Sequence, residues 1–185
     1  MLFRGGLTSV DVEGLISDQE AMTVYAYFGR AIYVSNILEH SVVNAIFVLK
    51  LLPKIRDFGS IDAWGDAVDD FFKLKFEKTF GNLLRELESC NRVTPATMML
   101  LWDAKKVRDF LAHHFNREKS DLFFSQSGRH ELIKECENAV RLLDAVDGDL
   151  EKEIAPIREA LGVDDQWLED RYREGIERLL KETEK

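Results

Sequence analysis

The sequence has few of the residues that interrupt helices or form covalent cross-links. Its 185 residues include only 3 Pro, 11 Gly and 2 Cys. Because proline and glycine are the strongest local breaks in a helical pattern, long uninterrupted helices are expected. The two cysteines, Cys90 and Cys136, lie in helical periodicity without metal-ligand neighbours. We therefore expect free thiols in a reducing compartment rather than a disulfide.

Positive charge is also scarce. The chain has 25 Lys and Arg against 34 Asp and Glu, a net charge of −9 and a pI near 5.0. A protein that holds nucleic acid along its whole surface is usually basic, because neutralising phosphates drives that binding. The balance therefore excludes a general nucleic-acid clamp. No DNA partner is expected, and any contact with RNA must be local.

No long apolar run is free of polar residues. The longest apolar stretch, residues 31–52, contains polar or charged residues that a membrane-spanning helix would not tolerate without special pairing: Asn36, Glu39, His40, Asn44 and Lys50. Residues 1–14 contain no apolar core of a secretory signal. We therefore expect a cytoplasmic protein without a membrane partner, in which residues 31–52 belong to a core helix.

Apolar residues recur in steps of three and four along most of the chain, which predicts amphipathic helices. The first helix is expected from Ser17 or Asp18 to Pro53. The next two are expected over 66–79 and 82–91. A fourth is expected from the start signal Thr94-Pro95 to about Phe115. Residues 116–126 read as a loop in which Phe123 and Phe124 fold back onto the helices.

The remaining residues predict two further helices. Ser127 is expected to cap a long helix that Pro156 kinks or ends. Gly162 marks a helix exit, and Asp164 or Asp165 caps a charged helix that runs to Lys185. The expected fold is therefore all-α: an antiparallel bundle of four to five helices over residues 17–161, preceded by an irregular segment, 1–16, and followed by a charged C-terminal helix, 162–185.

Local positive charge is concentrated at the end of the fourth helix, where five cations in residues 104–119 face two acids, Asp109 and Glu118. Within this window Arg108 is followed by Asp109 and, after three more residues, by His113. This arrangement, with Leu111-Ala112 before the histidine, resembles the Arg-polar-x-x-x-His motif of the HEPN superfamily. Residues 29–39, 78–84 and the pair Gly128-Arg129 also resemble that superfamily, so the likeness covers roughly residues 20–150.

The resemblance implies a HEPN-like bundle that acts as a metal-independent endoribonuclease in a stress, defence or toxin–antitoxin setting. His113 would transfer protons, because histidine titrates near neutral pH. Arg108 would hold the phosphate with its two-pronged guanidinium. Asp109 would orient His113, which lies four residues on and on the same helix face. A rim that admits RNA would come from the neighbouring polar residues Lys105, Lys106, His114, Arg117 and Lys119.

Helix geometry bears on how such a site would be assembled. Arg108 and His113 are five residues apart, about 140° around an ideal helix, so they do not face each other directly. This favours a site composed from two subunits of a homodimer, as the resemblance implies. Glu39, an acid among apolar residues, needs a partner, and Arg108 is one candidate. Phe115 stands where nucleotidyltransferase-paired members of the superfamily have a tyrosine, so control by adenylylation there is doubtful.

Three alternatives remain open from the sequence. The first is a non-catalytic HEPN module that binds RNA, nucleotide or a partner protein, such as a cognate antitoxin, through the same groove. The second is a structural or immunity-type helical bundle in which the motif is accidental. The third is a metal site at His113, His114 and Asp109. No tetrahedral ligand set and no Glu-x-x-His pair is present, so no metal or other cofactor is expected.

Overall fold

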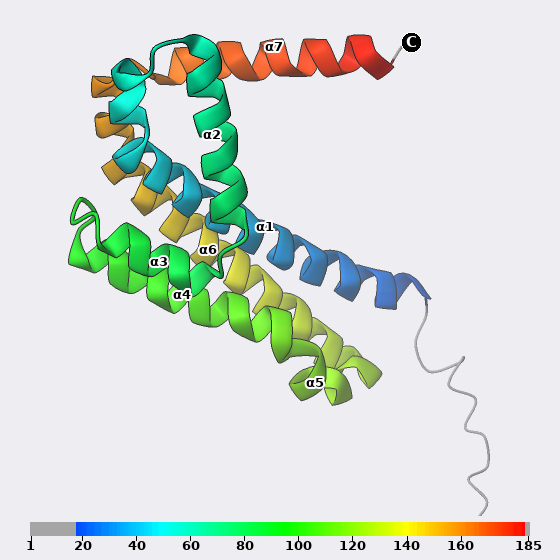
Figure 1. Cartoon of the computed structure of the whole chain (residues 1–185). Coiled ribbons are helices and arrows are strands. Elements are labelled where there is room, and N and C mark those ends of the chain that lie inside the picture. The colour runs from blue at the N-terminus through cyan, green and yellow to red at the C-terminus, as the bar shows by residue number, and fades with distance from the viewer. Residues whose placement is uncertain (1–17, 184–185) are drawn as a thin grey trace, which may run out of the picture. The chain divides into compact units, whose positions relative to one another are not determined.

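The computed structural model describes residues 18–183 and confirms the all-α fold. Those residues form helices and contain no strand. The structure contains the long helices α1 (Asp18–Lys50), α2 (Ile61–Phe76), α3 (Phe80–Glu88), α4 (Pro95–His113), α6 (Gln126–Ala160) and α7 (Asp165–Thr183), the short helix α5 (Phe115–Lys119), and the 3-10 helices η2 (Leu52–Asp57) and η3 (Ser120–Phe124) (Figure 1). The segment 1–16 lies outside the described residues.

The chain folds as two compact units that share its long helices. Among the described residues, the first unit comprises 18–37 and 104–144, and the second comprises 38–103 and 145–183. The division therefore passes through α1, α4 and α6, each of which gives one part to each unit. It differs from the sequence-based segments, which separated residues 17–161 from 162–185.

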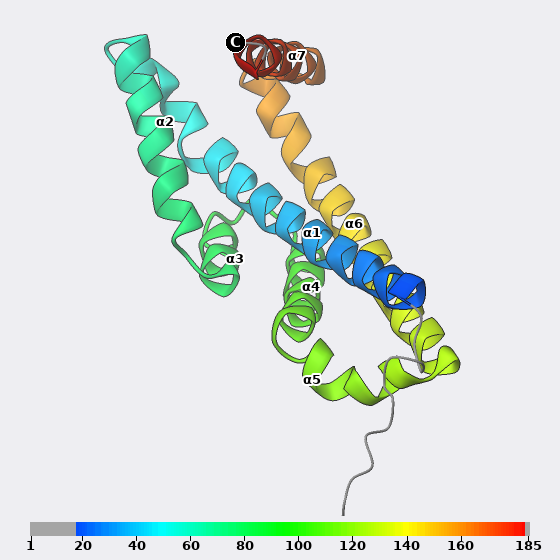
Figure 2. The ribbon, with the colours of Figure 1, turned by 90° about the vertical axis from the view of Figure 1, so that its right-hand side faces the viewer.

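The first unit has a three-helix core. Its parts of α1 and α6 run in the same direction and its part of α4 runs against them (Figures 1 and 2). Apolar side chains at helical spacing point between these helices, which is the burial that stabilises them. The buried set is Val24, Ala31, Val34, Ala104, Leu111, Phe115, Leu132, Cys136, Ala139, Val140 and Leu143.

The second unit packs α3 and the remaining parts of α1, α4 and α6 around a larger apolar core. Its fully buried side chains include Leu38, Ile46, Leu83, Leu84, Leu87, Leu101 and Leu150. Beside that core, Phe47 of α1 contacts three aromatic rings of α2, namely Trp64, Phe71 and Phe72, with centroids 5.4–6.1 Å away. α2 has no fully buried residue, and these ring contacts pack it against α1.

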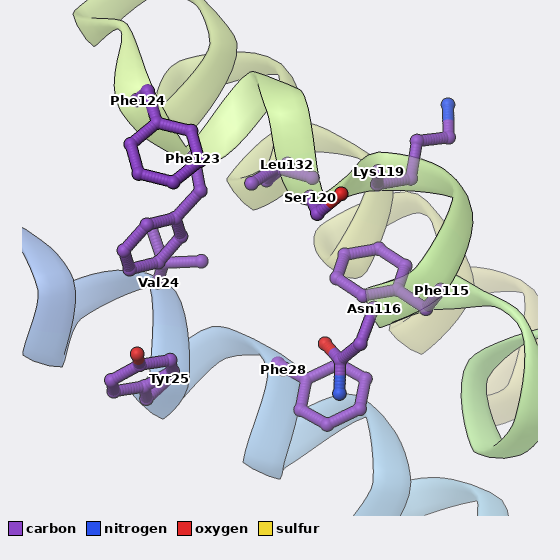
Figure 3. A pocket seen from close by; sticks show the side chains of 10 residues that line it. All are labelled: Val24, Tyr25, Phe28, Phe115, Asn116, Lys119, Ser120, Phe123, Phe124 and Leu132. Atoms are coloured by element: carbon purple, nitrogen blue, oxygen red, sulfur yellow. The ribbon is translucent and has the colours of Figure 1, made fainter. Parts of the chain in front are cut away.

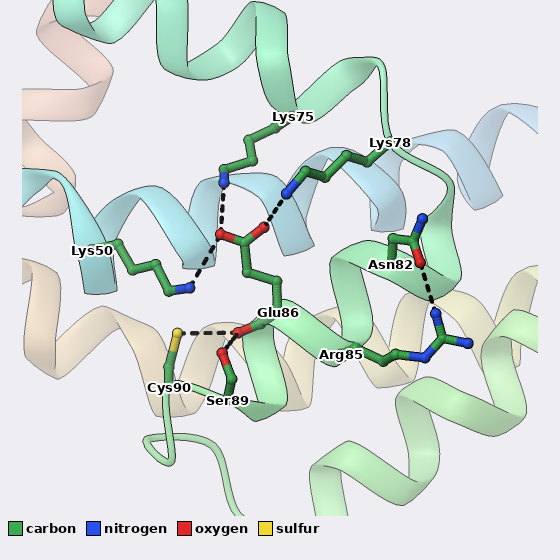
Figure 4. A network of polar contacts seen from close by, with 8 residues as sticks. All are labelled: Lys50, Lys75, Lys78, Asn82, Arg85, Glu86, Ser89 and Cys90. Carbon is green, nitrogen blue, oxygen red and sulfur yellow. Dashed lines mark hydrogen bonds and ion pairs between the residues drawn. The ribbon is translucent and has the colours of Figure 1, made fainter.

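A charged network in the second unit links α1, α2 and α3 (Figure 4). The Glu86 carboxylate accepts from Lys75 at 2.6 Å, from Lys78 at 2.8 Å and from Lys50 at 3.1 Å. Burial raises the pKa of Glu86, but the three ammonium groups outweigh it and lower that pKa to about 2. One carboxylate thus gathers cations from α1, from α2 and from the turn that follows α2.

Several predicted helix ends are confirmed. Thr94 caps α4 by accepting from the backbone N–H of Thr97 at 3.3 Å, whereas the predicted cap of α1 at Ser17 or Asp18 lies at the edge of the described residues. Asp164 caps α7 through Trp167 N–H at 2.8 Å. At Gly162, φ is +85° and the backbone bonds close a Schellman turn, in which Val163 N–H donates to Arg158 C=O. These ends follow from local side-chain chemistry, which is why sequence could predict them.

Other predicted boundaries are wrong. α6 continues through Pro156 to Ala160, so of the two predicted effects, a kink or an end, the end is excluded. Ser125 caps α6, not Ser127, because its hydroxyl accepts from Gly128 N–H at 3.0 Å. Residues 115–124 form α5 and η3 rather than a loop. The second helix begins at Ile61, five residues earlier than expected, because the Ser60 hydroxyl accepts from Ala63 N–H.

Within the described residues α1 is the one helix long and apolar enough to cross a membrane, judged by length and composition. A core helix passes the same test, and α1 has the burial pattern of one. Leu38, Val42, Val43 and Ile46 are fully enclosed in the second unit, while His40 and Asn44 between them are exposed. This alternation agrees with the expectation that residues 31–52 belong to a core helix.

Candidate functional site

The three residues of the predicted catalytic motif lie in the last two turns of α4, in the first unit. Arg108 and Asp109 are half-buried, and His113 is the exposed last residue of the helix. Since α4 stays helical through His113, no unwinding brings the imidazole round toward Arg108. Within the described part of the chain, no hydrogen bond or ion pair engages the His113 ring.

Asp109 is placed beside the cations that precede it. Its carboxylate accepts a hydrogen bond from Lys105, one helical turn earlier, and a long one from Arg108 Nη1 at 3.4 Å. Burial raises the pKa of Asp109, but Lys105 and Arg108 together hold it below its usual value. The structure therefore brings Asp109 together with Lys105 and Arg108, and it does not bring Asp109 together with His113.

The next histidine, His114, is the centre of a second polar cluster. It precedes α5, and its Nδ1 lies 2.7 Å from Arg117 Nη2 and 3.1 Å from Glu118 Oε1. A hydrogen bond from Arg117 is the main reason that the pKa of Glu118 lies below its usual value. The His114 ring also stacks on Phe110 of α4, with ring centroids 6.4 Å apart. His114 is thus held on three sides, in contrast to His113.

The remaining cations of the predicted rim have different surroundings. Lys119 donates to Glu135 of α6 at 2.6 Å, an ion pair that raises the pKa of Lys119. Lys106 is exposed on α4 and lines a groove of about 430 Å³ between α4 and α6, whose lining also includes Val107, Phe110 and Leu142. Lys105, Arg117 and Lys119 each have a carboxylate partner, so the positive charge of this surface is partly neutralised.

Glu39, the predicted support for Arg108, lies half-buried on the part of α1 that belongs to the second unit. Arg108 belongs to the first unit. His40, which follows Glu39 in the sequence, is exposed and packs against Phe76 of α2 with ring centroids 4.7 Å apart. Because of this ring contact, we interpret His40 as a residue that packs α2 against α1.

An aromatic pocket of about 400 Å³ opens beside α5 in the same unit as the motif (Figure 3). It lies between the second and third turns of α1, the short helices α5 and η3, and Leu132 of α6. Asn116, three residues after His113, is part of its lining. The full lining is Val24, Tyr25, Phe28, Phe115, Asn116, Lys119, Ser120, Phe123, Phe124 and Leu132.

Sequence reasoning missed several of these features. The acids Glu118 and Glu135 were not expected to hold the rim cations, although Glu118 is four residues after His114, a spacing that pairs side chains on a helix. Glu135 is 16 residues from Lys119 and carries no such signal. The expected folding back of Phe123 and Phe124 is half right, since Phe123 stacks on Tyr25 at 5.5 Å whereas Phe124 remains exposed.

No group of three or more His, Cys, Asp or Glu side chains that could hold a metal ion occurs in the part of the chain that the structure describes. Comparison of the chain with protein-family models, with curated proteins and with solved structures finds no match. What is established is an all-α helical bundle with a cationic, histidine-containing surface at the end of α4.

Proposed function

We propose that this chain is a HEPN-like, metal-independent endoribonuclease whose site lies at the C-terminal end of α4. The observation that carries the proposal is the exposed imidazole of His113 at the end of the helix that carries Arg108. Among the described residues the His113 imidazole has no protein partner, so it is available to a substrate hydroxyl, whereas His114 is already engaged. We further propose that the protein works in the cytoplasm, in a stress, defence or toxin–antitoxin setting, where an antitoxin would be its partner.

The proposed reaction needs only these two groups and the RNA itself. His113 accepts the proton of a ribose 2′-hydroxyl, and the freed oxygen attacks the adjacent phosphorus. The bond to the 5′-oxygen of the next nucleotide breaks, which leaves a 2′,3′-cyclic phosphate. The departing 5′-oxygen takes a proton from water, and the His113 imidazolium returns its proton to water, so the enzyme is regenerated. Arg108 stabilises the negative charge that develops on the phosphate oxygens.

The paired rim cations are compatible with this role. The Lys105–Asp109 and Lys119–Glu135 pairs are partly open to solvent, with side-chain exposures of 26–36%. Exposed ion pairs of this kind stabilise a protein by about 1 kcal/mol or less, so a phosphate can replace the carboxylate at little cost. Binding should therefore be weak at physiological salt and should strengthen as salt is lowered.

The site is proposed to be composite. Arg108 and His113 project about 140° apart around the helical α4. One phosphate therefore cannot contact both side chains of the same helix unless one of them bends far around the helix. A two-fold axis beside the end of α4 would place His113 of one subunit opposite Arg108 of the other. The apolar groove that contains Val107, Phe110 and Leu142 offers a surface for that contact.

The experiment is cleavage of a labelled single-stranded RNA in EDTA by wild type, Arg108→Ala and His113→Ala. Matched controls are Arg141→Ala and His130→Ala, which change exposed residues of α6 in the same unit. We expect cleavage to a 2′,3′-cyclic phosphate by wild type and both controls, and at least a 100-fold loss in the two motif variants. Equal rates in all five proteins, or none in wild type, would refute the nuclease.

A second candidate is a non-catalytic HEPN-like module that binds RNA through the same surface. The observation in its favour is that Lys105, Arg117 and Lys119 each have a carboxylate partner, on a chain of net charge −9. The same experiment separates the two functions. Binding of intact RNA that is lost in Arg108→Ala, without any cleaved product from wild type, supports the module.

A further inference from the structure

The aromatic pocket of the first unit has two ring pairs on opposite sides of its opening (Figure 3). Tyr25 of α1 stacks on Phe123 of η3, with centroids 5.5 Å apart and planes 21° from parallel. Phe28 of α1 stacks on Phe115 of α5, at 5.0 Å and 22°. Tyr25 is 58% exposed, so much of its ring is open to a ligand.

Interactions outside the pocket hold its η3 wall in place. The side chain of Arg129, which is 7% exposed, donates to the Phe123 carbonyl at 3.0 Å and pairs with Glu20 of α1 at 3.1 Å. At Gly128 the α6 backbone comes so close to η3 that a Cβ atom would lie 2.1 Å from the Leu122 carbonyl oxygen. The separation between the Phe123 wall and α1 is therefore fixed by packing, which preserves the open space between them.

The polar groups of the pocket come from one short stretch of chain. Asn116 has an exposed amide, which offers a donor and an acceptor side by side, and Ser120 adds a hydroxyl. Lys119 also lines the pocket, but its ammonium points away from the rings and pairs with Glu135 of α6 (Figure 3). Flat rings beside an amide and a hydroxyl match a nucleobase, which has stacking faces and a hydrogen-bonding edge.

We propose that this pocket binds one nucleobase of an RNA strand whose phosphate lies at the end of α4. The inference rests on the proposed function and names the nucleotide that positions the strand there. A cavity of about 400 Å³ is within the usual range for small-molecule sites and accommodates a base. Asn116 follows His113 by three residues, so their Cα atoms are at most about 11 Å apart.

The test measures binding to an RNA that cannot be cleaved. A fluorescein-labelled penta-adenylate with 2′-O-methyl riboses is titrated with the full-length protein at low salt, about 50 mM, where binding is expected to be stronger, and anisotropy gives the dissociation constant. The variants are Tyr25→Ala and Asn116→Ala, which change exposed residues and should fold normally. The matched control is Tyr33→Ala, since Tyr33 is a 66% exposed tyrosine of α1 in the same unit but outside the pocket.

Loss of a stacked base should weaken binding roughly 5- to 100-fold in Tyr25→Ala. Asn116→Ala should weaken it by a smaller factor, and Tyr33→Ala should bind like wild type. An abasic backbone of the same length should bind wild type and Tyr25→Ala equally. Equal affinity of wild type, Tyr25→Ala and Asn116→Ala for the penta-adenylate, or no binding by wild type, would overturn the inference.

Cleavage assays on unmodified RNA separate this inference from the proposed function. If wild type cleaves, His113→Ala does not, and Tyr25→Ala binds and cleaves like wild type, only the base pocket is wrong. If the penta-adenylate binds with the expected pattern and wild type leaves RNA intact, the pocket is upheld and the nuclease is wrong.

Discussion

Replacing Glu86 with glutamine removes the negative charge around which Lys50, Lys75 and Lys78 gather. The side chain is 15% exposed, and its pKa is lowered from an ordinary value of 4.5 to about 2. That displacement corresponds to about 3 kcal/mol of stability at neutral pH. Because Lys50 and Lys78 are about 40% exposed and screened by solvent, we expect an observed loss of about 2 kcal/mol.

The effect should depend on pH in a defined direction. A carboxyl whose pKa is lowered by folding stabilises the protein above its unfolded pKa, and that stabilisation is lost as pH falls through the folded value. The difference between wild type and Glu86→Gln should therefore be constant from pH 7 to about 5 and shrink between pH 4.5 and 2. Urea unfolding followed by circular dichroism at several pH values measures it.

The matched control is Glu88→Gln, an exposed glutamate at the end of the same helix. It should leave the free energy of unfolding within about 0.5 kcal/mol of wild type. The reasoning is refuted if Glu86→Gln is as stable as Glu88→Gln at pH 7. It is also refuted if the Glu86→Gln deficit stays the same down to pH 2.

Two further predictions concern the first unit. Gly128→Ala should lower the free energy of unfolding by about 1–3 kcal/mol, because its Cβ would meet the Leu122 backbone; a melting temperature equal to that of wild type would contradict this close approach. Cys136 should not react with a thiol reagent at pH 8 in the native protein and should react on unfolding, because burial raises its pKa to about 11. Rapid labelling of native Cys136, compared with Cys136→Ser, would contradict its burial.

Periodicity and local capping chemistry were sufficient to predict most of the fold. Thr94, Gly162 and Asp164 end or begin helices through hydrogen bonds to residues at most five positions away. The local sequence therefore contains the whole signal. Pro156 was expected to kink or end its helix, and α6 does not end there. A proline removes one backbone donor, but the packing of α6 on both sides, through Ile154 and Arg158, keeps the helix continuous.

The candidate site was less predictable because its interactions are made through space. The spacing of Asp109 and His113 suggested a pair, yet Asp109 also has Lys105 one turn earlier, and an ammonium competes for a carboxylate better than a neutral imidazole does. The pairing of Lys119 with Glu135 and the bracing of Phe123 by Arg129 join separate helices. No periodicity in the sequence indicates either contact.

The composite site of Arg108 and His113 is tested most directly by mixing two inactive variants. Purified Arg108→Ala and His113→Ala are combined in equal amounts, allowed to exchange subunits, and assayed for RNA cleavage in EDTA. If each site takes its arginine from one subunit and its histidine from the other, mixed dimers contain one intact site. The mixture should then recover about a quarter of wild-type activity. A mixture no more active than either variant alone, beside an active wild type, would contradict the account.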